Sequence, residues 1–498
     1  MDKIRKSGLL LHITSLPSGF GNGDMGFEAL RFADFLKNSG QKIWQVLPIN
    51  ALSAEYGFSP YSPVSVFGLN HLLISPEWMI NSGLVTSREA RADFHPRKTD
   101  FRASDEFRYY LAETAYKNRK NVLKGEKWDA FQEKNQNWIR DFCLFRALKN
   151  YFGLGISWRN WPEGLVRRDK DCISKWEKKL EKEIAVQTIL QFAAWSQWLE
   201  LKDYANSLGI KIMGDLPFYP CLESSDVWSG QELFRLDSQG TPLFVSGAPP
   251  DYFSSAGQLW NTPVYSWPAH EKEDFAWWVK RIEKNMEIFD CLRLDHFRGF
   301  CAYWQVPAGS DTAASGEWVP APGEKLMRKL IGACGQKQLI AEDLGEITPD
   351  VTRLKEKLGL AGMHVLQFAF GGDMSENPHI PHNHRRNGIV YTGTHDNNTL
   401  HGWFTQEADA RQIRLLREYT GKRVTRWDVA GRMLKCALSS VAATAVIPVQ
   451  DVLGLGWRAR MNNPAGSKKN WTWRLAPGQL KDSHSRQLAR LNGLYGRG

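Results

Sequence analysis

The stretch CLRLDHFRGF (291–300) has the apolar and aromatic pattern of a buried strand, yet it carries the ionisable residues Arg293, Asp295, His296 and Arg298. Moving an unpaired carboxylate out of water costs several kcal/mol, so a strand that only packs normally excludes one. Residues two apart in a strand point to the same face, which places Arg293 beside Asp295. A guanidinium keeps a neighbouring carboxylate ionised and fixes its orientation. The stretch therefore predicts a strand with an oriented charge at one end.

The same pattern, an apolar run that ends in polar residues, recurs along the chain and is followed by turn-forming residues and helical periodicity. We predict eight such strands, at 8–13, 42–49, 210–218, 291–297, 337–344, 363–370, 388–396 and 444–453. Helices are predicted between them, for example at 26–40 and at 348–359, where Thr348 precedes a Pro and Gly359 ends the pattern. This alternation predicts an α/β fold, a (β/α)₈ TIM barrel with its active site at the carboxyl ends of the strands.

The spacing of the predicted strands indicates insertions. The second and third strands are about 160 residues apart, too far for a simple crossover. Residues 70–205 between them are rich in helical patterns, so we predict an inserted, mainly helical subdomain there. In residues 219–285, the Gly-, Pro- and aromatic-rich stretch 246–260 predicts an inserted loop and helical segment over the active site. About 45 residues follow the last strand, too few for a C-terminal β-sandwich, so residues 1–498 are predicted to form one catalytic barrel domain.

Composition excludes several classes of protein. The chain has 498 residues, 42% of them apolar and 24% charged, as in soluble globular proteins. No run approaches roughly 18 consecutive apolar residues, and the N-terminal apolar run is too short for a signal peptide. Seven scattered cysteines without a C-x-x-C pair argue against a zinc knuckle or a disulfide framework and fit a reducing compartment. We therefore predict a cytoplasmic protein that does not bind a membrane.

The net charge and the aromatic content each suggest a class of binding partner, nucleic acid and sugars respectively. The net charge of +10 suggests nucleic acid, but much of the charge lies in mixed runs such as 167–183, where basic and acidic residues interleave as on a solvated helix face. No nucleic-acid-binding motif accompanies it, so no nucleic-acid partner is predicted. The 21 Trp, 14 Tyr and 25 Phe residues are mostly explained by core packing. The surplus of Trp also suits sugar binding, because the apolar face of a pyranose stacks on an aromatic ring.

Several predicted strands end in a carboxylate, and each carboxylate has more than one interpretation. Asp295, held by Arg293, meets the requirement for a nucleophile, while a structural ion pair inside the barrel is the alternative. In KQLIAEDLG (337–345), one of Glu342 and Asp343 should face the rim and the other should cap the following helix; strand parity does not decide which. A Glu shielded by apolar neighbours has a raised pKa and can act as a general acid.

The last of these strands, in GIVYTGTHDNNT (388–399), ends in His395 and Asp396. A His–Asp pair also occurs in metal sites, but no third ligand lies at a suitable spacing, so no metal is predicted. The segment GFGNGDMG (19–26) lacks the Lys of a phosphate-binding loop. A nucleophilic carboxylate, an acid/base carboxylate and a third carboxylate beside a His form the set that retaining glycoside transfer requires.

These residues, in this order, resemble the 4-α-glucanotransferases of the amylomaltase (disproportionating enzyme) type, relatives of the α-amylases. The resemblance runs nearly end to end. The segments that carry it include LLLHITSLPS (9–18), SPYSPVSVFGLN (59–70), GDLPF (214–218), GAPPDYFSSAGQLW (247–260), RLDHFRGF (293–300), AEDLG (341–345), YTGTHDNNT (391–399) and PVQDVLGLG (448–456).

The resemblance implies transfer of an α-1,4-glucan segment from a maltooligosaccharide donor to the 4-hydroxyl of a glucose or glucan acceptor, by retaining double displacement. It makes Asp295 the nucleophile, Glu342 the acid/base and Asp396 the non-covalent stabiliser of a distorted sugar. It also implies substrate-binding roles for Tyr61, Asp215, Gln258, Trp260, Arg293, His296 and His395. No metal or organic cofactor is implied, and we expect a monomer or a weak homo-oligomer.

The chain departs from the family pattern at a few positions. Phe58 precedes SPY where Asp is usual, Asn398 stands where Asp is common, and MNNPAGSKKNW (461–471) lacks two expected glycines. An α-amylase would have a His soon after Asp215 and a C-terminal sandwich, and both are missing here. An α-glucan hydrolase with the same site and a non-catalytic glucan- or nucleic-acid-binding protein are the alternatives, although a binding protein has no need of three such carboxylates.

Overall fold

The structure is a computed structural model that describes residues 5–118, 125–250, 256–335, 338–464, 466 and 469–498. Its centre is a barrel of eight parallel strands: β1 (Lys6–Leu10), β2 (Ile43–Gln45), β5 (Lys211–Leu216), β8 (Cys291–Leu294), β11 (Gln338–Ala341), β12 (Gly362–Val365), β13 (Gly388–Tyr391) and β14 (Thr444–Pro448). Each overlaps one of the predicted strands, so the predicted barrel is confirmed.

The strands lie in the order β11-β8-β5-β2-β1-β14-β13-β12, which is chain order around a ring. A parallel bridge between Ile340 and Ala361 closes the ring, and the Ala341 amide donates to the Ala361 carbonyl at 2.8 Å. Closure leaves no free strand edge in the barrel.

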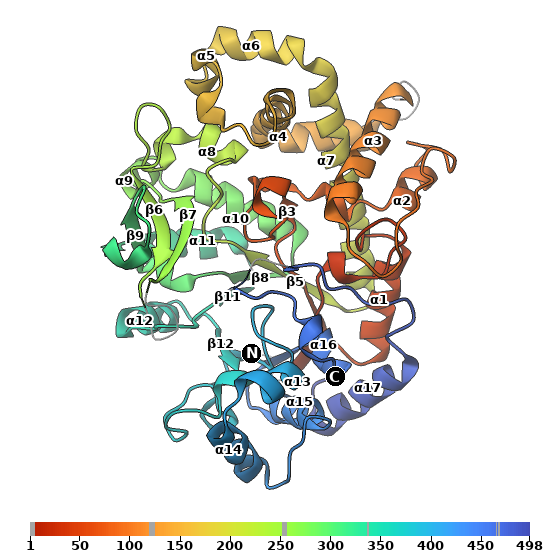
Figure 1. Cartoon of the computed structure of the whole chain (residues 1–498), viewed down its shortest axis with the longest axis vertical. Coiled ribbons are helices and arrows are strands. Elements are labelled where there is room, and N and C mark those ends of the chain that lie inside the picture. Colours follow the sequence, from red (N-terminus) through yellow and green to blue (C-terminus); the bar gives the residue numbers. More distant parts are fainter. Residues whose placement is uncertain (1–4, 119–124, 251–255, 336–337, 465, 467–468) are drawn as a thin grey trace.

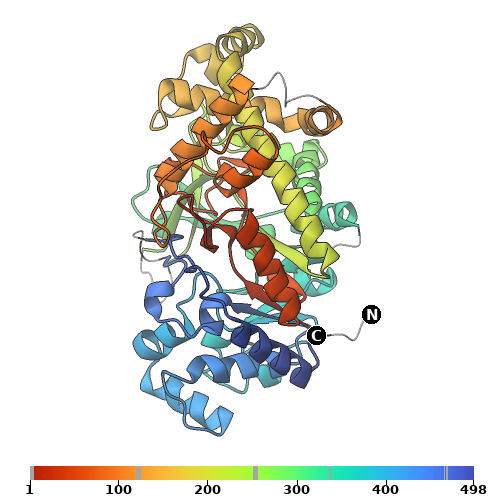
Figure 2. The same ribbon diagram turned by 90° about the vertical axis from the view of Figure 1, so that its right-hand side faces the viewer.

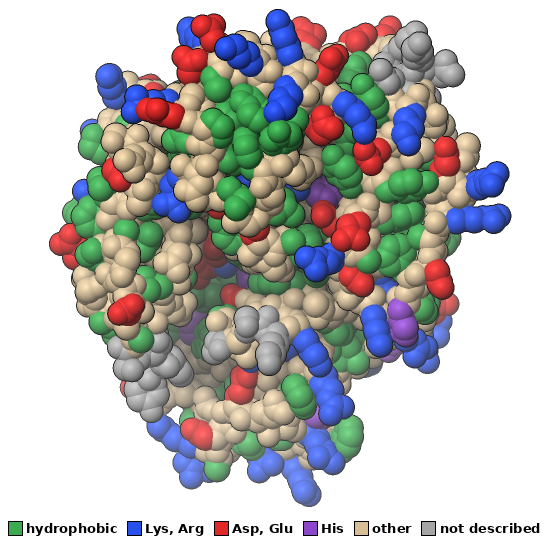
Figure 3. Space-filling model, turned by 45° about the horizontal axis from the view of Figure 1, so that its top comes forward, with side chains coloured by type: hydrophobic (Ala, Val, Ile, Leu, Met, Phe, Trp, Pro, Cys, Tyr) green, Lys and Arg blue, Asp and Glu red, His purple; other side chains and the backbone are tan. Residues whose placement is uncertain are grey.

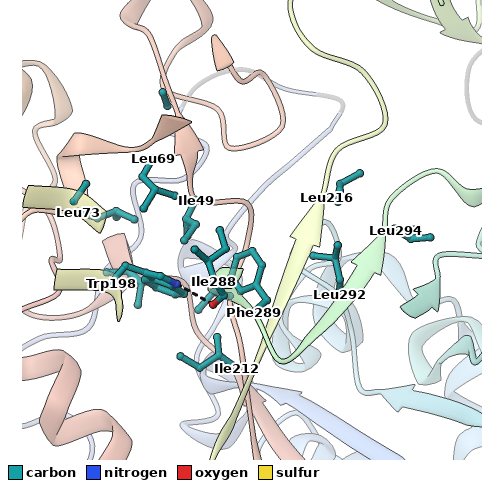
Figure 4. Close-up of a cluster of buried hydrophobic side chains, with 14 of the residues drawn as sticks. Ile49, Leu69, Leu73, Trp198, Ile212, Leu216, Ile288, Phe289, Leu292 and Leu294 are labelled. Carbon is teal, nitrogen blue, oxygen red and sulfur yellow. Dashed lines mark hydrogen bonds between the residues drawn. The ribbon is translucent and has the colours of Figure 1, made fainter. Parts of the chain in front are cut away.

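Alternation along the strands divides their side chains between two cores. An inner cluster inside the barrel includes Met213, Cys291, Ile340 and Tyr391. The outer faces carry the opposite set and pack against helices and loops. Figure 4 shows part of this outer core, where the indole of Trp198 donates to the Ile288 carbonyl at 2.9 Å.

The helices that surround the barrel fall into two groups. Those between β2 and β5 form the upper part of the molecule in Figures 1 and 2: α2 (Pro76–Asn81), α3 (Phe101–Asn118), α4 (Glu126–Phe152), α5 (Glu163–Val166), α6 (Lys170–Lys179) and α7 (Glu181–Ser207). The same stretch of chain begins with the hairpin of β3 (Asn50–Ala51) and β4 (Ser65–Leu69). The crossovers between the other barrel strands contain α1 (Phe27–Asn38), α11 (Gly323–Cys334), α12 (Pro349–Lys357), α13 (Leu400–Gly402), α14 (Ala410–Thr420) and α15 (Val429–Ser439), and α16 (Val449–Val452) and α17 (Asp482–Tyr495) follow β14.

A second sheet stands beside the barrel on the loops after β5 and β8. It is antiparallel, in the order β10 (Glu317–Pro320), β9 (Ala302–Pro307), β6 (Phe244–Ala248) and β7 (Gln258–Pro263). The sequence pattern of residues 219–285 predicts only a loop and helices, whereas the structure also has the strands β6 and β7 there. β6 pairs with β7 inside the segment and with β9 outside it, and the sequence pattern of the segment carries no sign of that distant partner.

The 219–285 segment also contains the helices α8 (Ser225–Ser229) and α9 (Trp267–Lys272) and most of α10 (Ala276–Ile288). Residues 251–255 of the predicted active-site loop lie outside the described residues. After β14 the described chain forms helices and turns and no sandwich. In the described ranges, no helix is both long enough and apolar enough to cross a membrane.

Candidate active site

Inside the barrel, apolar side chains are followed by charged side chains toward the carboxyl ends of the strands. Asp215 and Arg293 each lie two residues beyond an apolar member of the inner cluster, Met213 and Cys291, and they are paired in the register of β5 and β8. One guanidinium nitrogen, Arg293 Nη1, lies 2.7 Å from both carboxylate oxygens of Asp215 and 2.8 Å from Oδ1 of Asp295. A single buried cation therefore orients two carboxylates, of which Asp215 is inaccessible and Asp295 is 27% exposed.

Glu342 directly follows the neighbouring strand, β11. Ala341 pairs with Leu294 in the register of β11 and β8. Glu342 and Asp295 are the next residues of these two strands' chains, and neighbouring strands lie about 4.8 Å apart, so the two residues start side by side. The Glu342 carboxylate accepts from the His296 amide at 2.8 Å and from the Leu344 amide at 3.1 Å. These bonds hold the carboxyl group of Glu342 beside the backbone that carries Asp295.

The surroundings of Glu342 raise the pKa of its carboxyl group. Burial raises the pKa of Glu342 to about 7, against the lowering effect of the Arg293 cation, and the negative charge of Asp295 adds to the rise. Because the carboxyl group titrates near neutrality, it can donate a proton in one step and accept one in the next. Glu342 thus has the character of an acid/base group.

The structure assigns the two acidic residues of this strand to different tasks. Asp343 accepts from the Met363 amide at 2.7 Å and pairs with Lys355. It does not cap the following helix, contrary to the sequence expectation for the second acidic residue. That helix, α12, has the predicted Thr348 as N-cap residue, but the Thr348 hydroxyl accepts from Arg298 at 2.6 Å.

Asp396 lies in the loop that follows β13. Its Oδ2 lies 3.2 Å from Nε2 of His395, and its Oδ1 accepts from the amide of Asn462 at 2.6 Å. The side chain of Asp396 is 44% exposed. Burial by itself favours the neutral acid, but His395 and Asn462 outweigh it and lower the pKa of Asp396 to about 2. The carboxylate is therefore ionised throughout the neutral range.

Tyr61 connects the two sides of the barrel mouth. Its hydroxyl donates to Asp215 at 2.6 Å and lies 3.4 Å from Nδ1 of His395. The Tyr61 and His395 rings are stacked, with centroids 4.8 Å apart and planes 13° from parallel. Burial disfavours a charged His395, but the adjacent Asp396 outweighs it and raises the pKa of His395.

The strand β7 brings the predicted residues Gln258 and Trp260 to the same site. The indole of Trp260 donates to the side chain of Gln258 at 3.2 Å, and its ring meets the His296 ring edge-on at 4.9 Å. His296 has a left-handed backbone (φ 51°), which is strained for a residue with a side chain and is typical of functional sites. The ten predicted site residues thus form one contiguous group.

Two residues of the site carried no prediction. Asn462 bonds Asp396, and the Trp471 ring lies 5.8 Å from that of Tyr61. The only sequence signal was their place in the segment 461–471, of which residues 465 and 467–468 lie outside the described residues.

Figure 3 shows a hollow in the face of the molecule, with acidic, basic and histidine side chains inside it.

The rim of the barrel carries three carboxyl groups whose surroundings differ, and this combination suits one kind of chemistry. One is oriented by a cation, one titrates near pH 7 and one stays ionised. Glycosidic bond exchange with retention needs a nucleophile and an acid/base of this kind in close proximity. The fold and the site define a barrel enzyme of the retaining, glycoside-hydrolase type.

Comparisons with known proteins identify the family. A family model described as 4-alpha-glucanotransferase matches residues 11–480. The 4-alpha-glucanotransferase of Aquifex aeolicus is 43% identical over 497 residues, covering 99% of this chain and all of the relative. That of Thermus thermophilus is 41% identical over 496 residues, with 98% of both chains covered. The chain belongs to this family of 4-alpha-glucanotransferases, which act on α-1,4-glucans.

Solved structures agree with this assignment. The amylomaltase from Streptococcus agalactiae, solved in complex with acarbose, superimposes with a TM-score of 0.93 at 35% identity, covering 99% of this chain and all of the other. The amylomaltase from Corynebacterium glutamicum has a TM-score of 0.76 at 16% identity and covers 99% of this chain and 75% of the other, which is a likeness of fold.

Proposed function

We propose that this 4-α-glucanotransferase works by retaining double displacement, with Asp295 as the nucleophile, Glu342 as the acid/base and Asp396 as the stabiliser of the reacting sugar. The observation that carries the proposal is the pairing, on adjacent strands, of a carboxylate oriented by Arg293 with a carboxyl group whose pKa is about 7. Retention requires two carboxyl groups about 5–5.5 Å apart, and residues that follow adjacent parallel strands can be placed at such a separation.

In the first step, an oxygen of Asp295 attacks C1 of the donor sugar while Glu342 gives its proton to the glycosidic oxygen. The C1–O bond breaks, the shortened glucan leaves, and a glycosyl ester of Asp295 remains. In the second step, the Glu342 carboxylate takes the proton from the 4-hydroxyl of the acceptor. The acceptor oxygen then attacks C1 and frees Asp295, so that the two inversions give overall retention.

The remaining residues of the site would hold the sugar. Asp396 is ionised and fixed by His395 and Asn462, so it can accept hydrogen bonds from sugar hydroxyls and favour the positively charged transition state. The ring of Tyr61 would stack on the donor sugar, with Asp215 fixing its hydroxyl. Trp260, Gln258 and His296 would line the donor and acceptor path. Acarbose, which the Streptococcus agalactiae relative binds, is the expected inhibitor of this site.

Transfer competes with hydrolysis at the ester stage. Acceptor subsites that bind sugar well and exclude water favour transfer. With maltotriose as the only substrate, we expect glucose together with maltooligosaccharides longer than three units. A product mixture of glucose and maltose alone would identify a hydrolase instead.

The nucleophile is tested by its removal. Asp295→Gly should lower turnover of maltotriose by roughly 10⁴-fold or more, since no ester can form. Azide should restore turnover of α-maltosyl fluoride, because the small anion fits the vacated space and attacks the same face of C1. The product, identified by NMR, should be β-maltosyl azide.

The matched control is Asp274→Asn, which removes a surface carboxylate that is 76% exposed and pairs with Lys329. It should leave turnover unchanged. If Asp295→Gly kept activity near that of the control, the nucleophile assignment would be wrong.

We also propose that the enzyme acts in the cytoplasm as a monomer or a weak homo-oligomer. A reducing compartment is supported by the seven cysteines, all of which lie in the described ranges and none of which forms a disulfide.

A further inference from the structure

The segment 460–462 holds Asp396 at two points. Asn462 donates from its amide to the Asp396 carboxylate at 2.6 Å, and Arg460 Nη2 donates to the backbone carbonyl of Asp396 at 2.7 Å. Arg460 Nε also donates to the backbone carbonyl of Asn462 at 2.7 Å, so one guanidinium ties the two residues together. The direction in which the Asp396 carboxylate points therefore depends on where Arg460 lies.

Arg460 is itself held from its other side. Its Nη1 lies 3.1 Å from Oε1 of Glu407, and the same oxygen accepts from Nδ2 of Asn398 at 2.9 Å. Glu407 is the last residue of a π-helical turn, Trp403–Glu407, which is a rare conformation frequently found at functional sites. This turn brings the Glu407 carboxylate to a point between Asn398 and Arg460.

The side chain of Asn398 has only one orientation compatible with its neighbours. Its Oδ1 accepts from the Thr399 amide at 2.9 Å, which leaves Nδ2 to donate to Glu407. Gly402 packs against this amide so closely that a Cβ there would lie 2.1 Å from Asn398 Oδ1. An aspartate at 398 would have no proton to donate and would place a second negative charge against Glu407.

We propose that Asn398, Glu407 and Arg460 are positioning residues, which together set the orientation of the Asp396 carboxylate and thereby the rate of the chemical step. None of the three needs to touch the glucan. They act through the backbone carbonyl of Asp396 and through Asn462. The inference rests on the proposed role of Asp396, and it extends that role to residues beyond the reacting atoms.

The proposal makes a kinetic prediction for Asn398→Asp. With maltotriose, kcat should fall about 10- to 100-fold, because a displaced catalytic group can cost this much. KM should change by less than about threefold, since an interaction made mainly in the transition state affects kcat. Glu407→Gln keeps a neutral acceptor for Arg460 and should have a smaller effect. The double variant N398D/E407Q should recover the kcat of E407Q, because the amide at 407 can donate to the carboxylate at 398.

Two measurements separate positioning from a general loss of structure. The melting temperatures of N398D and E407Q should stay close to that of the unchanged protein, and Glu418→Gln, which alters an exposed pair with Arg414, serves as the control for a lost surface carboxylate. In an Asp396→Asn background, N398D should produce no further loss of kcat. The proposal is overturned if N398D leaves kcat unchanged, if the double variant shows no recovery, or if N398D costs as much in the D396N background. Full activity of D396N alone would instead contradict the proposed function.

Discussion

The Glu342 carboxyl group is subject to opposing influences that set its protonation. Burial raises its pKa to about 7 even though the Arg293 cation lowers it. As the proposed acid of the first step, Glu342 must carry a proton, and it does so below its pKa. We therefore expect kcat/KM for maltotriose to fall as the pH rises through about 7, with a basic limb close to that value.

A donor that needs no protonation provides the control for this pH profile. Fluoride leaves from α-maltosyl fluoride without a proton from Glu342, so its kcat/KM should lack the basic limb. Glu342→Gln should likewise react with the fluoride far better than with maltotriose. A basic limb of equal midpoint for both donors would assign the pKa to another group.

At the scale of the element, strand parity explains how a barrel core becomes an active site. The inner residues of β5, β8 and β11 change from Met213, Cys291 and Ile340 to charged residues two positions further on. This step follows from the period of a strand, so the barrel, its rim and the Arg293–Asp295 pair were predictable from the sequence. The sequence could not predict that Arg293 also binds the buried Asp215, because that contact depends on the pairing of β5 with β8.

The outer face of β5 also restricts which side chains fit, and a substitution of Gly214 tests this restriction. A Cβ at Gly214 would lie 2.2 Å from the ring of Phe289, which belongs to the outer core of Figure 4. Gly214→Ala must therefore displace that ring, and we expect a loss of about 1–3 kcal/mol in the free energy of unfolding, measured with denaturant. Gly332→Ala in α11 is the control, because nothing lies within 4 Å of its Cβ position. It should be neutral or stabilising by up to about 1 kcal/mol, since Ala favours a helix more than Gly.

At the scale of the whole molecule, the site is assembled from segments far apart in the chain. Tyr61 reaches Asp215, which is 154 residues away, and Asn462 reaches Asp396 across 66 residues. Periodicity reports only local structure, so neither Asn462 nor Arg460 could be assigned from it. The antiparallel pairing of β6 with β9 was unpredictable for the same reason.

At the same scale, we expect acid to destabilise the protein, because it buries neutral histidines. His364 and His384 stack with ring centroids 4.3 Å apart, and burial lowers the pKa of each to about 4. The ordinary value is about 6.5, so the unfolded chain binds these protons first. Their contribution to stability is complete above about pH 6.5 and is lost as the pH falls toward 4, by about 1–3 kcal/mol for each histidine. The net charge, already +10 at pH 7, rises over the same interval and adds repulsion.

The histidine contribution can be isolated by difference. Burial also raises the pKa of Asp226 and of Asp451 to about 6, and these carboxyl groups favour the folded state as the pH falls. Both groups are present in the unchanged protein and in a His364→Gln/His384→Gln variant, so they cancel when the two pH profiles are subtracted. The unfolding free energy of the unchanged protein should fall more steeply between pH 7 and pH 4.5 than that of the variant. Parallel profiles would show that the stacked histidines do not cause the acid sensitivity.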